Sequence, residues 1–322
     1  MAVRTVLGPV AADSLGRVDY HDHLFHVSPL LPGDDLDDEA ASGAEAASLW
    51  ASGFDTLLDV TPIGLGRRPE AVARISAATG LAVIASTGLH RQAHYPAEDP
   101  LRQLDVETKA AVFVRELTVG QLADDAELRA GRSVDDLTIA RAPGGEPILA
   151  GLIKTGIDYW RISPFERSTL EAAAAAHRAT GAPIVVHLEF CTAAHELLDL
   201  LGAEGVAADR VVLAHADRDP DAELHLELIA RGAYLGYDGM ARPKGDSEAV
   251  LLKLTEDVVA GGGTHRLLLG ADVARRSRYL AYGGIPGLEY LGRRYVPRLR
   301  RRLGDTALQQ ILVTNPADLL AR

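Results

Sequence analysis

The stretch Val18-Asp19-Tyr20-His21-Asp22-His23-Leu24-Phe25 carries both a strand pattern and two histidines. Side chains alternate between the two faces of a strand, so His21 and His23, two residues apart, leave the same face. Two imidazoles on one face can bind the same metal ion. A His-x-His pair by itself is more often incidental than a metal site, so the rest of the chain decides its meaning.

Seven further apolar runs, rich in Val, Ile and Leu, follow at residues 54–61, 81–88, 148–156, 183–190, 210–217, 233–240 and 266–273. Continuous runs of this length are typical of strands that are buried on both faces of a parallel sheet. Segments of helical period separate them, at residues 39–51, 69–79, 101–117, 164–180, 192–203, 220–231 and 247–260. A strand followed by a helix, repeated eight times, predicts an α/β fold, a (β/α)8 TIM barrel.

Further features of the chain agree with a barrel. Residues 287–322 predict two extra C-terminal helices on its outer wall, and residues 118–147 predict a short helix and a loop. The alternative fold is an open doubly wound sheet. It lacks support, because Gly64 and Gly66 do not open into a G-x-G-x-x-G turn.

Composition bounds the class of protein. The 322 residues are 47% hydrophobic and 24% charged, which suits a large core, and we expect residues 1–322 to form a single domain. The only cysteine, Cys191, excludes an internal disulfide framework. No signal peptide or long apolar run is present, so we expect a cytoplasmic protein without a membrane span. The net charge of -12 argues against nucleic acid as a partner.

Residues of metal-ligand type stand within or just after five of the predicted strands: His21, His23, Lys154, His187, His215 and Asp272. Barrel enzymes build their active sites at the carboxyl ends of the strands, so these side chains meet at one mouth. Burying ionisable side chains there is energetically costly unless each has a partner, and a pair of metal ions would be such a partner. For His187 or His215 alone, a hydrogen-bonded core histidine is the alternative.

The other histidines fall into two groups. His26, His90 and His94 lie near the barrel mouth and either line the pocket or belong to plain loops. The remaining four fall in helices or at their ends, and we expect them to be solvated: His177, His195, His225 and His265.

Several motifs together carry a family resemblance. They are His21-x-His23, the strand Gly151-Leu152-Ile153-Lys154, His187, His215 and Asp272, in this order, with Gly66-Arg67, Thr87-Gly88, Tyr95-Pro96 and Tyr282-Gly283-Gly284. On these residues the chain resembles the phosphotriesterase family of the amidohydrolase superfamily, over nearly its whole length.

The resemblance implies a binuclear metal site, usually of zinc. His21, His23 and Asp272 would hold the buried metal, and His187 and His215 the more exposed one. Lys154 would bridge the two as an N-carboxylated lysine. Burial pushes a lysine towards its neutral amine, which can add carbon dioxide and become an anionic oxygen ligand.

This site implies hydrolysis. A hydroxide between two metal ions exists at neutral pH and can attack a carbonyl or phosphoryl centre, while Asp272 takes up the proton and passes it to the leaving group. The metals do not distinguish a lactone from a phosphotriester, so the loops after the last two strands decide the substrate.

Those loops are basic. They carry Arg242, Lys244, Arg275, Arg276 and Arg278. Together these residues predict a clamp for a phosphate or carboxylate, although each arginine could instead pair with a surface carboxylate. The loops are similar to those of family members that hydrolyse phosphorylated sugar lactones.

The hypothesis is therefore a lactonase that opens a small anionic lactone, with Tyr95 and Tyr279 joining the basic residues in binding this small-molecule substrate. An organophosphate triesterase or acyl-lactone lactonase with the same metal site is one alternative. A binding protein without turnover is the other, although it would be expected to lack a ligand. A homodimer is a further hypothesis that the sequence leaves open.

Overall fold

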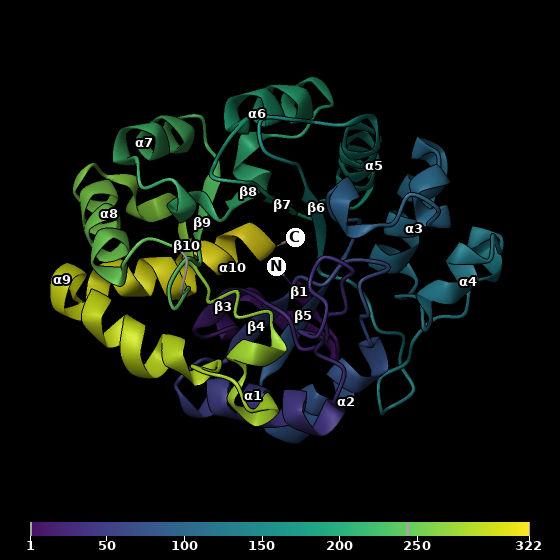
Figure 1. Ribbon diagram of the computed structural model, residues 1–322, viewed down its shortest axis with the longest axis horizontal. Helices are drawn as coiled ribbons and strands as arrows, with labels where there is room; N and C mark the ends of the chain where they lie inside the picture. The colour runs from purple at the N-terminus through teal and green to yellow at the C-terminus, as the bar shows by residue number, and fades with distance from the viewer. Residues whose placement is uncertain (1, 243–244, 322) are drawn as a thin grey trace.

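The computed structural model describes residues 2–242 and 245–321, and a sheet of eight parallel strands forms its centre (Figure 1). The strands are β3 (Val18–Asp22), β4 (Thr56–Asp59), β5 (Ala82–Thr87), β6 (Leu152–Gly156), β7 (Ile184–His187), β8 (Val211–Ala214), β9 (Tyr234–Tyr237) and β10 (Leu267–Leu269). Strands that are consecutive in the chain are neighbours in the sheet. The first and last strands approach each other, because the Asp272 amide just after β10 donates to the His21 carbonyl at 2.9 Å. The fold is the predicted (β/α)8 TIM barrel.

Helices surround the strands (Figure 1). They are α1 (Glu39–Ala51), α2 (Pro69–Thr79), α3 (Val106–Thr118), α4 (Asp125–Arg129), α5 (Pro164–Thr180), α6 (Ala194–Ala203), α7 (Ala222–Ala230), α8 (Glu248–Ala260), α9 (Val296–Gln309) and α10 (Asn315–Leu320). Local sequence explains where α5 begins and ends. Ser163 and Glu166 form a capping box at its start, and Gly181 follows it in the left-handed conformation with φ 72°. No helix in the described part of the chain is long and apolar enough to span a membrane.

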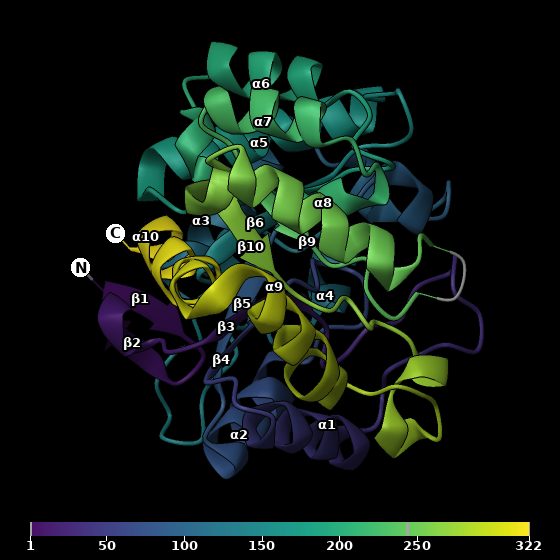
Figure 2. The ribbon, with the colours of Figure 1, turned by 90° about the vertical axis from the view of Figure 1, so that its left-hand side faces the viewer.

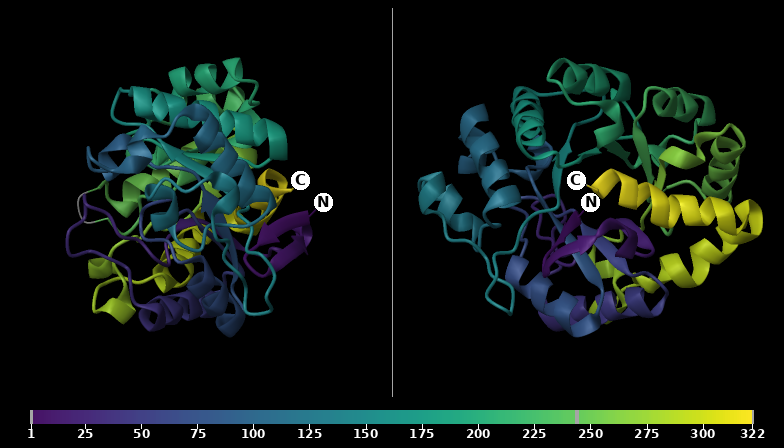
Figure 3. Two further views of the ribbon diagram at one scale, coloured as in Figure 1. Left: turned by 90° about the vertical axis from the view of Figure 1, so that its right-hand side faces the viewer. Right: turned by 180° about the vertical axis from the view of Figure 1, so that it is seen from behind.

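One element was not predicted. Strands β1 (Ala2–Thr5) and β2 (Gly8–Ala11) form an antiparallel hairpin beside α10 at one end of the barrel (Figures 2 and 3). Val3 and Leu319 pack in one apolar cluster with Val18 of β3, so hairpin and helix close the amino end of the barrel. Four-residue strands, one of them without a buried residue, leave too weak an apolar pattern to be recognised.

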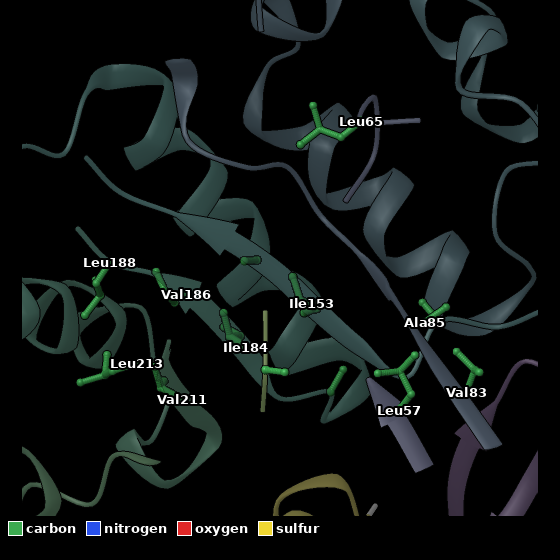
Figure 4. Close-up of a cluster of buried hydrophobic side chains, with 14 of the residues drawn as sticks. Leu57, Leu65, Val83, Ala85, Ile153, Ile184, Val186, Leu188, Val211 and Leu213 are labelled. Atoms are coloured by element: carbon green, nitrogen blue, oxygen red, sulfur yellow. The ribbon is translucent and has the colours of Figure 1, made fainter. Parts of the chain in front are cut away.

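The central strands separate two apolar clusters. Ile153, Ile184 and Val186 belong to the larger cluster, which reaches the surrounding helices (Figure 4). Leu152 and Val185 belong to the smaller cluster inside the barrel. Since side chains alternate along a strand, the residues two positions later on the same strands also face inward. The barrel thus places its functional side chains directly above an apolar floor.

Candidate metal centre

Strand geometry brings the predicted ligands to one place. Lys154 and His187 follow Leu152 and Val185 by two positions, so alternation turns both inward. His215 and Asp272 come just after β8 and β10 and have φ 62° and 42°. Left-handed conformations are uncommon for such residues and concentrate at functional sites.

The first strand departs from simple alternation. The pairing of β3 with β4 changes register between Asp19 and Asp22. As a result, neighbouring Tyr20 and His21 both reach Asp238, at the end of β9. The prediction that His21 and His23 share a side holds, with their ring centroids 5.5 Å apart.

Two sets of donor atoms lie close enough together to hold a metal ion. His21, His23 and Asp272 form one set, in which Asp272 Oδ1 is 3.8 Å from His21 Nε2 and 3.7 Å from His23 Nε2. His21 and His215 form the second set with Asp238, which the sequence analysis did not assign. All these residues are buried, and buried ionisable side chains without partners are costly. A bound metal ion would give them a common partner.

Asp238 orients two of the imidazoles. Its carboxylate lies 2.6 Å from His215 Nδ1 and 3.2 Å from His21 Nδ1, and it also accepts a hydrogen bond from Tyr20. With Nδ1 of His215 bonded to this carboxylate and Nδ1 of His21 beside it, Nε2 of each ring is left to bind a metal. Metal-binding histidines are commonly held by such carboxylates.

The other two histidines have outer partners as well. His23 Nδ1 lies 2.8 Å from Thr61 Oγ1, and His187 Nε2 lies 2.9 Å from Glu189 Oε1. His187 Nδ1, its remaining nitrogen, is 2.8 Å from His215 Nε2. Each of the four imidazoles therefore directs one nitrogen outward to a fixed partner and keeps one for the centre.

Lys154 is the other candidate ligand. Its side chain is fully buried, and among the described residues its Nζ has no hydrogen-bond partner. Burial lowers the pKa of its amine to about 7. An unpaired buried amine is costly, and an amine with a lowered pKa can take up carbon dioxide in its neutral form, so this environment fits the predicted modification.

The imidazoles are also suited to metals electrostatically. Burial lowers the pKa of His21 to about 4. Burial likewise holds the pKa values of His23, His187 and His215 well below the ordinary range. Metals bind the neutral form of histidine, so these rings are in the required protonation state.

Two arginines lie against Asp272. Arg242 forms an ion pair with its carboxylate, and Arg218 Nη2 lies 3.4 Å from Asp272 Oδ2. Arg242 belongs to the basic loop after β9. Arg218 was missed in the sequence, although its place three residues after His215, at a strand end, was a usable signal.

The two tyrosines predicted to bind substrate have other partners. Tyr95 is buried, and its hydroxyl donates to the Ile63 carbonyl at 2.9 Å. Tyr279 is fully buried, and its hydroxyl donates to the His23 carbonyl at 2.6 Å. These hydroxyls bond to a loop and to the backbone of a candidate ligand, and substrate binding by the two tyrosines stays a prediction.

Two of the predicted clamp residues are also held elsewhere. Arg278 is buried and donates to the backbone carbonyls of Ala241 and Asp272, at 2.9 and 3.3 Å, so it joins two loops. Arg276 is half exposed, lies 3.7 Å from Asp37 and stacks on Tyr282. Backbone carbonyls thus engage Arg278 and surface groups engage Arg276, and a substrate contact by either residue stays a prediction.

Arg275 remains beside the mouth. It lies 3.6 Å from Asp34, and its charge adds to burial in lowering the pKa of His26. Lys244, the other predicted clamp residue, lies outside the described residues.

The burial of several other histidines is also defined by the structure. His26, His90 and His94 are buried next to the candidate ligands, with the His26 ring centroid 5.0 Å from that of His23. The expectation of solvation is wrong for His225. This side chain is fully buried, and its Nδ1 and Nε2 bond to the Tyr237 hydroxyl and the Ala216 carbonyl at 2.5 and 3.1 Å.

Comparisons with known proteins agree with this geometry. The model of the phosphotriesterase family matches residues 1–135 and 132–320. A phosphotriesterase homology protein of Escherichia coli is 30% identical over 95% of this chain and 98% of its own length. A phospho-furanose lactonase of Mycoplasmopsis agalactiae is 29% identical over 99% of this chain and 91% of its own.

Solved structures show the same similarity. A lactonase from Listeria monocytogenes superposes with a TM-score of 0.85 at 26% identity, over 100% of this chain and 99% of that protein. The Escherichia coli phosphotriesterase homology protein, solved with phosphate in its active site, has a TM-score of 0.82 at 26% identity, over 96% of this chain and 99% of its own.

Proposed function

The chain belongs to the phosphotriesterase family and is a metal-dependent hydrolase, and from this premise we propose that it is a lactonase that opens a small lactone bearing an anionic group. A phosphorylated sugar lactone is the proposed substrate. The observation that carries the proposal is the concentration of cationic side chains on one side of the ligand set. Arg218 and Arg242 lie against Asp272, and Arg275 lies beside His26.

In this proposal the metal site follows the family pattern. His21, His23 and Asp272 would hold one divalent ion, which we propose is zinc, and His187 and His215 would hold the second. Lys154, carboxylated at Nζ, would supply a further oxygen ligand. When bound, the two ions supply an activated water and polarise the lactone carbonyl.

The protein's own groups do the rest. Asp238, Thr61 and Glu189 hold the imidazoles, so that the ligand atoms are preorganised. The Asp272 carboxylate is the proposed proton carrier. It would take up the proton that the attacking water loses and deliver it to the ring oxygen that leaves as the lactone opens. Arg218 and Arg242, which lie against this carboxylate, keep it oriented.

The anionic group of the substrate is proposed to bind Arg275, together with Lys244. Arg275 is 42% exposed, and its ion pair among the described residues is with Asp34 at a long 3.6 Å, so a substrate phosphate can replace that partner. Surface ion pairs of this kind contribute little and exchange readily. A relative named phospho-furanose lactonase supports this choice of substrate class.

One observation favours the second candidate, an acyl-lactone lactonase or organophosphate triesterase. Tyr159, Trp160 and Phe190 are 59%, 64% and 53% exposed on the loops after β6 and β7. The Tyr159 and Phe190 rings lie 6.3 Å apart and form an apolar rim. Although only 5% of the chain is aromatic, these three residues gather where a hydrophobic substrate would approach.

Metal analysis and a substrate panel test the proposal. The panel contains a pentonolactone with and without a 5-phosphate, an N-acyl lactone and an aryl dialkyl phosphotriester, each assayed with metal-loaded protein. We expect the highest kcat/KM for the phosphorylated lactone. Equal rates with and without the phosphate would reject the anionic substrate, and a preference for the N-acyl lactone or the phosphotriester would favour the second candidate.

A further inference from the structure

Seven imidazoles form a closed ring at the barrel mouth. Successive ring centroids are separated by 5.5 Å (His21–His23), 5.0 Å (His23–His26), 6.4 Å (His26–His94), 4.0 Å (His94–His90), 4.7 Å (His90–His187), 4.5 Å (His187–His215) and 4.8 Å (His215–His21). Four of these rings are candidate metal ligands. The other three, His26, His94 and His90, span the gap between His23 and His187, and we call them the histidine arc.

The histidine arc is buried beside the candidate ligands but lies outside the candidate ligand set. Its three members are 5–8% exposed, so the protein has buried all of them. Among the described residues, none of them forms an ion pair with a carboxylate, and none belongs to a set of three donor atoms that could hold a metal. Buried imidazoles beside a reaction centre therefore require another explanation.

Hydrogen-bonding capacity remains in the arc. His90 Nδ1 accepts from the Arg91 amide at 2.8 Å, so its proton sits on Nε2, which is a donor. His94 Nδ1 lies 2.9 Å from Ser28 Oγ, and no bond engages its other nitrogen among the described residues. His26 Nδ1 is buried and has no hydrogen-bond partner in the described structure. Leaving such atoms unpaired is unfavourable, so a ligand group that bonds to them would be stabilised there.

Burial disfavours the charged form of all three rings. Burial lowers the pKa of His26 to about 4 and that of His94 to about 3, and it holds the pKa of His90 well below its ordinary value. A neutral imidazole presents one donor and one acceptor. A hydroxyl group offers the same pair, whereas an alkyl chain offers neither.

We propose that the histidine arc binds the ring hydroxyl groups of a polyhydroxylated lactone and selects it over lactones that lack them. The inference rests on the proposed lactonase function and narrows its substrate class. Selection follows from burial, because a deoxy or alkyl lactone would leave the arc's nitrogens without partners. Sites built to bond a hydroxyl reject analogues without it far more strongly than apolar pockets reject added groups.

The experiment compares two lactones that differ only in their ring hydroxyls. Both carry the same 5-phosphate, so any contribution of Arg275 cancels. His94→Phe keeps a ring of similar shape but removes the hydrogen bonds, and His94→Gln restores a donor and an acceptor. His90→Phe provides a second position in the arc. His195→Phe, at an exposed histidine on α6, is the matched control.

For His94→Phe we expect kcat/KM on the hydroxylated lactone to fall ~10- to 100-fold, mainly through KM, while the dideoxy lactone changes less than about twofold. His94→Gln should recover part of the loss, and His195→Phe should match the parent. Metal content should be unchanged in both His94 variants.

Two results would overturn the proposal. Equal losses on both lactones would assign the arc to support of the ligands, and equal rates in all variants would remove it from substrate binding. In either case a parent that hydrolyses the phosphorylated lactone leaves the lactonase function standing. A metal-loaded parent that hydrolyses neither lactone would instead overturn the lactonase function, and the inference with it.

Discussion

The candidate ligands at the strand ends and the arginines after β10 are held in opposite ways. His21 and His215 are buried and fixed to one buried carboxylate, that of Asp238. Arg275 and Arg276 are 42% and 49% exposed, and the carboxylates near them are 3.6 and 3.7 Å away. The rigid group suits chemistry that needs fixed geometry, and the looser group suits binding that exchanges one anion for another.

Loss of the metals would affect the rigid group most. Removing them with a chelator should abolish hydrolysis, and added zinc should restore it, because the ligand atoms remain in place. The parent should carry about two divalent ions per chain, and Lys154→Ala should lose at least one. Elemental analysis alongside activity measures both effects. Full activity in metal-free protein would contradict the proposed centre.

Asp272→Asn separates metal binding from proton transfer. The amide keeps the shape and an oxygen ligand but cannot accept the proton, so kcat on the lactone should fall by roughly 10²–10⁴-fold while much of the metal stays bound. The variant's circular dichroism should match that of the parent. Parent-like turnover would show that another group carries the proton.

Asp238→Asn tests whether the carboxylate that holds His21 and His215 contributes to metal affinity. An amide does not offer a charged oxygen to both His21 and His215, so metal affinity should weaken by roughly 10- to 100-fold. Competition with a metal-binding dye measures the affinity directly. Saturating metal should restore most activity, whereas a loss that metal cannot reverse would mean that Asp238 serves the fold instead.

Arg275→Ala should have the smallest and most selective effect. Removing one charged hydrogen bond should cost about 1.5 kcal/mol, or roughly tenfold in kcat/KM, on the phosphorylated lactone only. The unphosphorylated lactone should be unaffected. Arg276→Ala is the matched control from the same loop, since Arg276 pairs with Asp37 and stacks on Tyr282. Equal effects of the two substitutions would contradict a specific role of Arg275 in binding the substrate phosphate.

Sequence patterns worked well wherever the barrel itself does the positioning. The positions of the candidate ligands His21, His187 and Asp272 could be read from apolar runs that end in a polar residue. Strand ends in such a barrel meet at one mouth whatever the intervening helices contain. The same reasoning placed α1, α2 and α5 at their observed bounds.

The patterns failed where a side chain's partner is distant in the chain. Tyr279 looked available for substrate, but it bonds to the His23 carbonyl, 256 residues away. His225 lies in a helix of mixed character, and only the packing of α7 against β9 shows that it is buried. Glu189 follows His187 by two residues, yet nothing local shows that its carboxylate bonds to that imidazole.

The sequence by itself determined the barrel and which strands end in ligand-type residues, because both depend on local periodicity and on the closure of a repeated β/α unit. Tertiary structure alone decided which nitrogen of each histidine faces the centre, which arginines are already paired and that seven imidazoles close into a ring. Those features arise from contacts between loops of different strands. Hydrogen bonds and ion pairs act over a few ångströms in space, and spacing along the chain does not encode such distances.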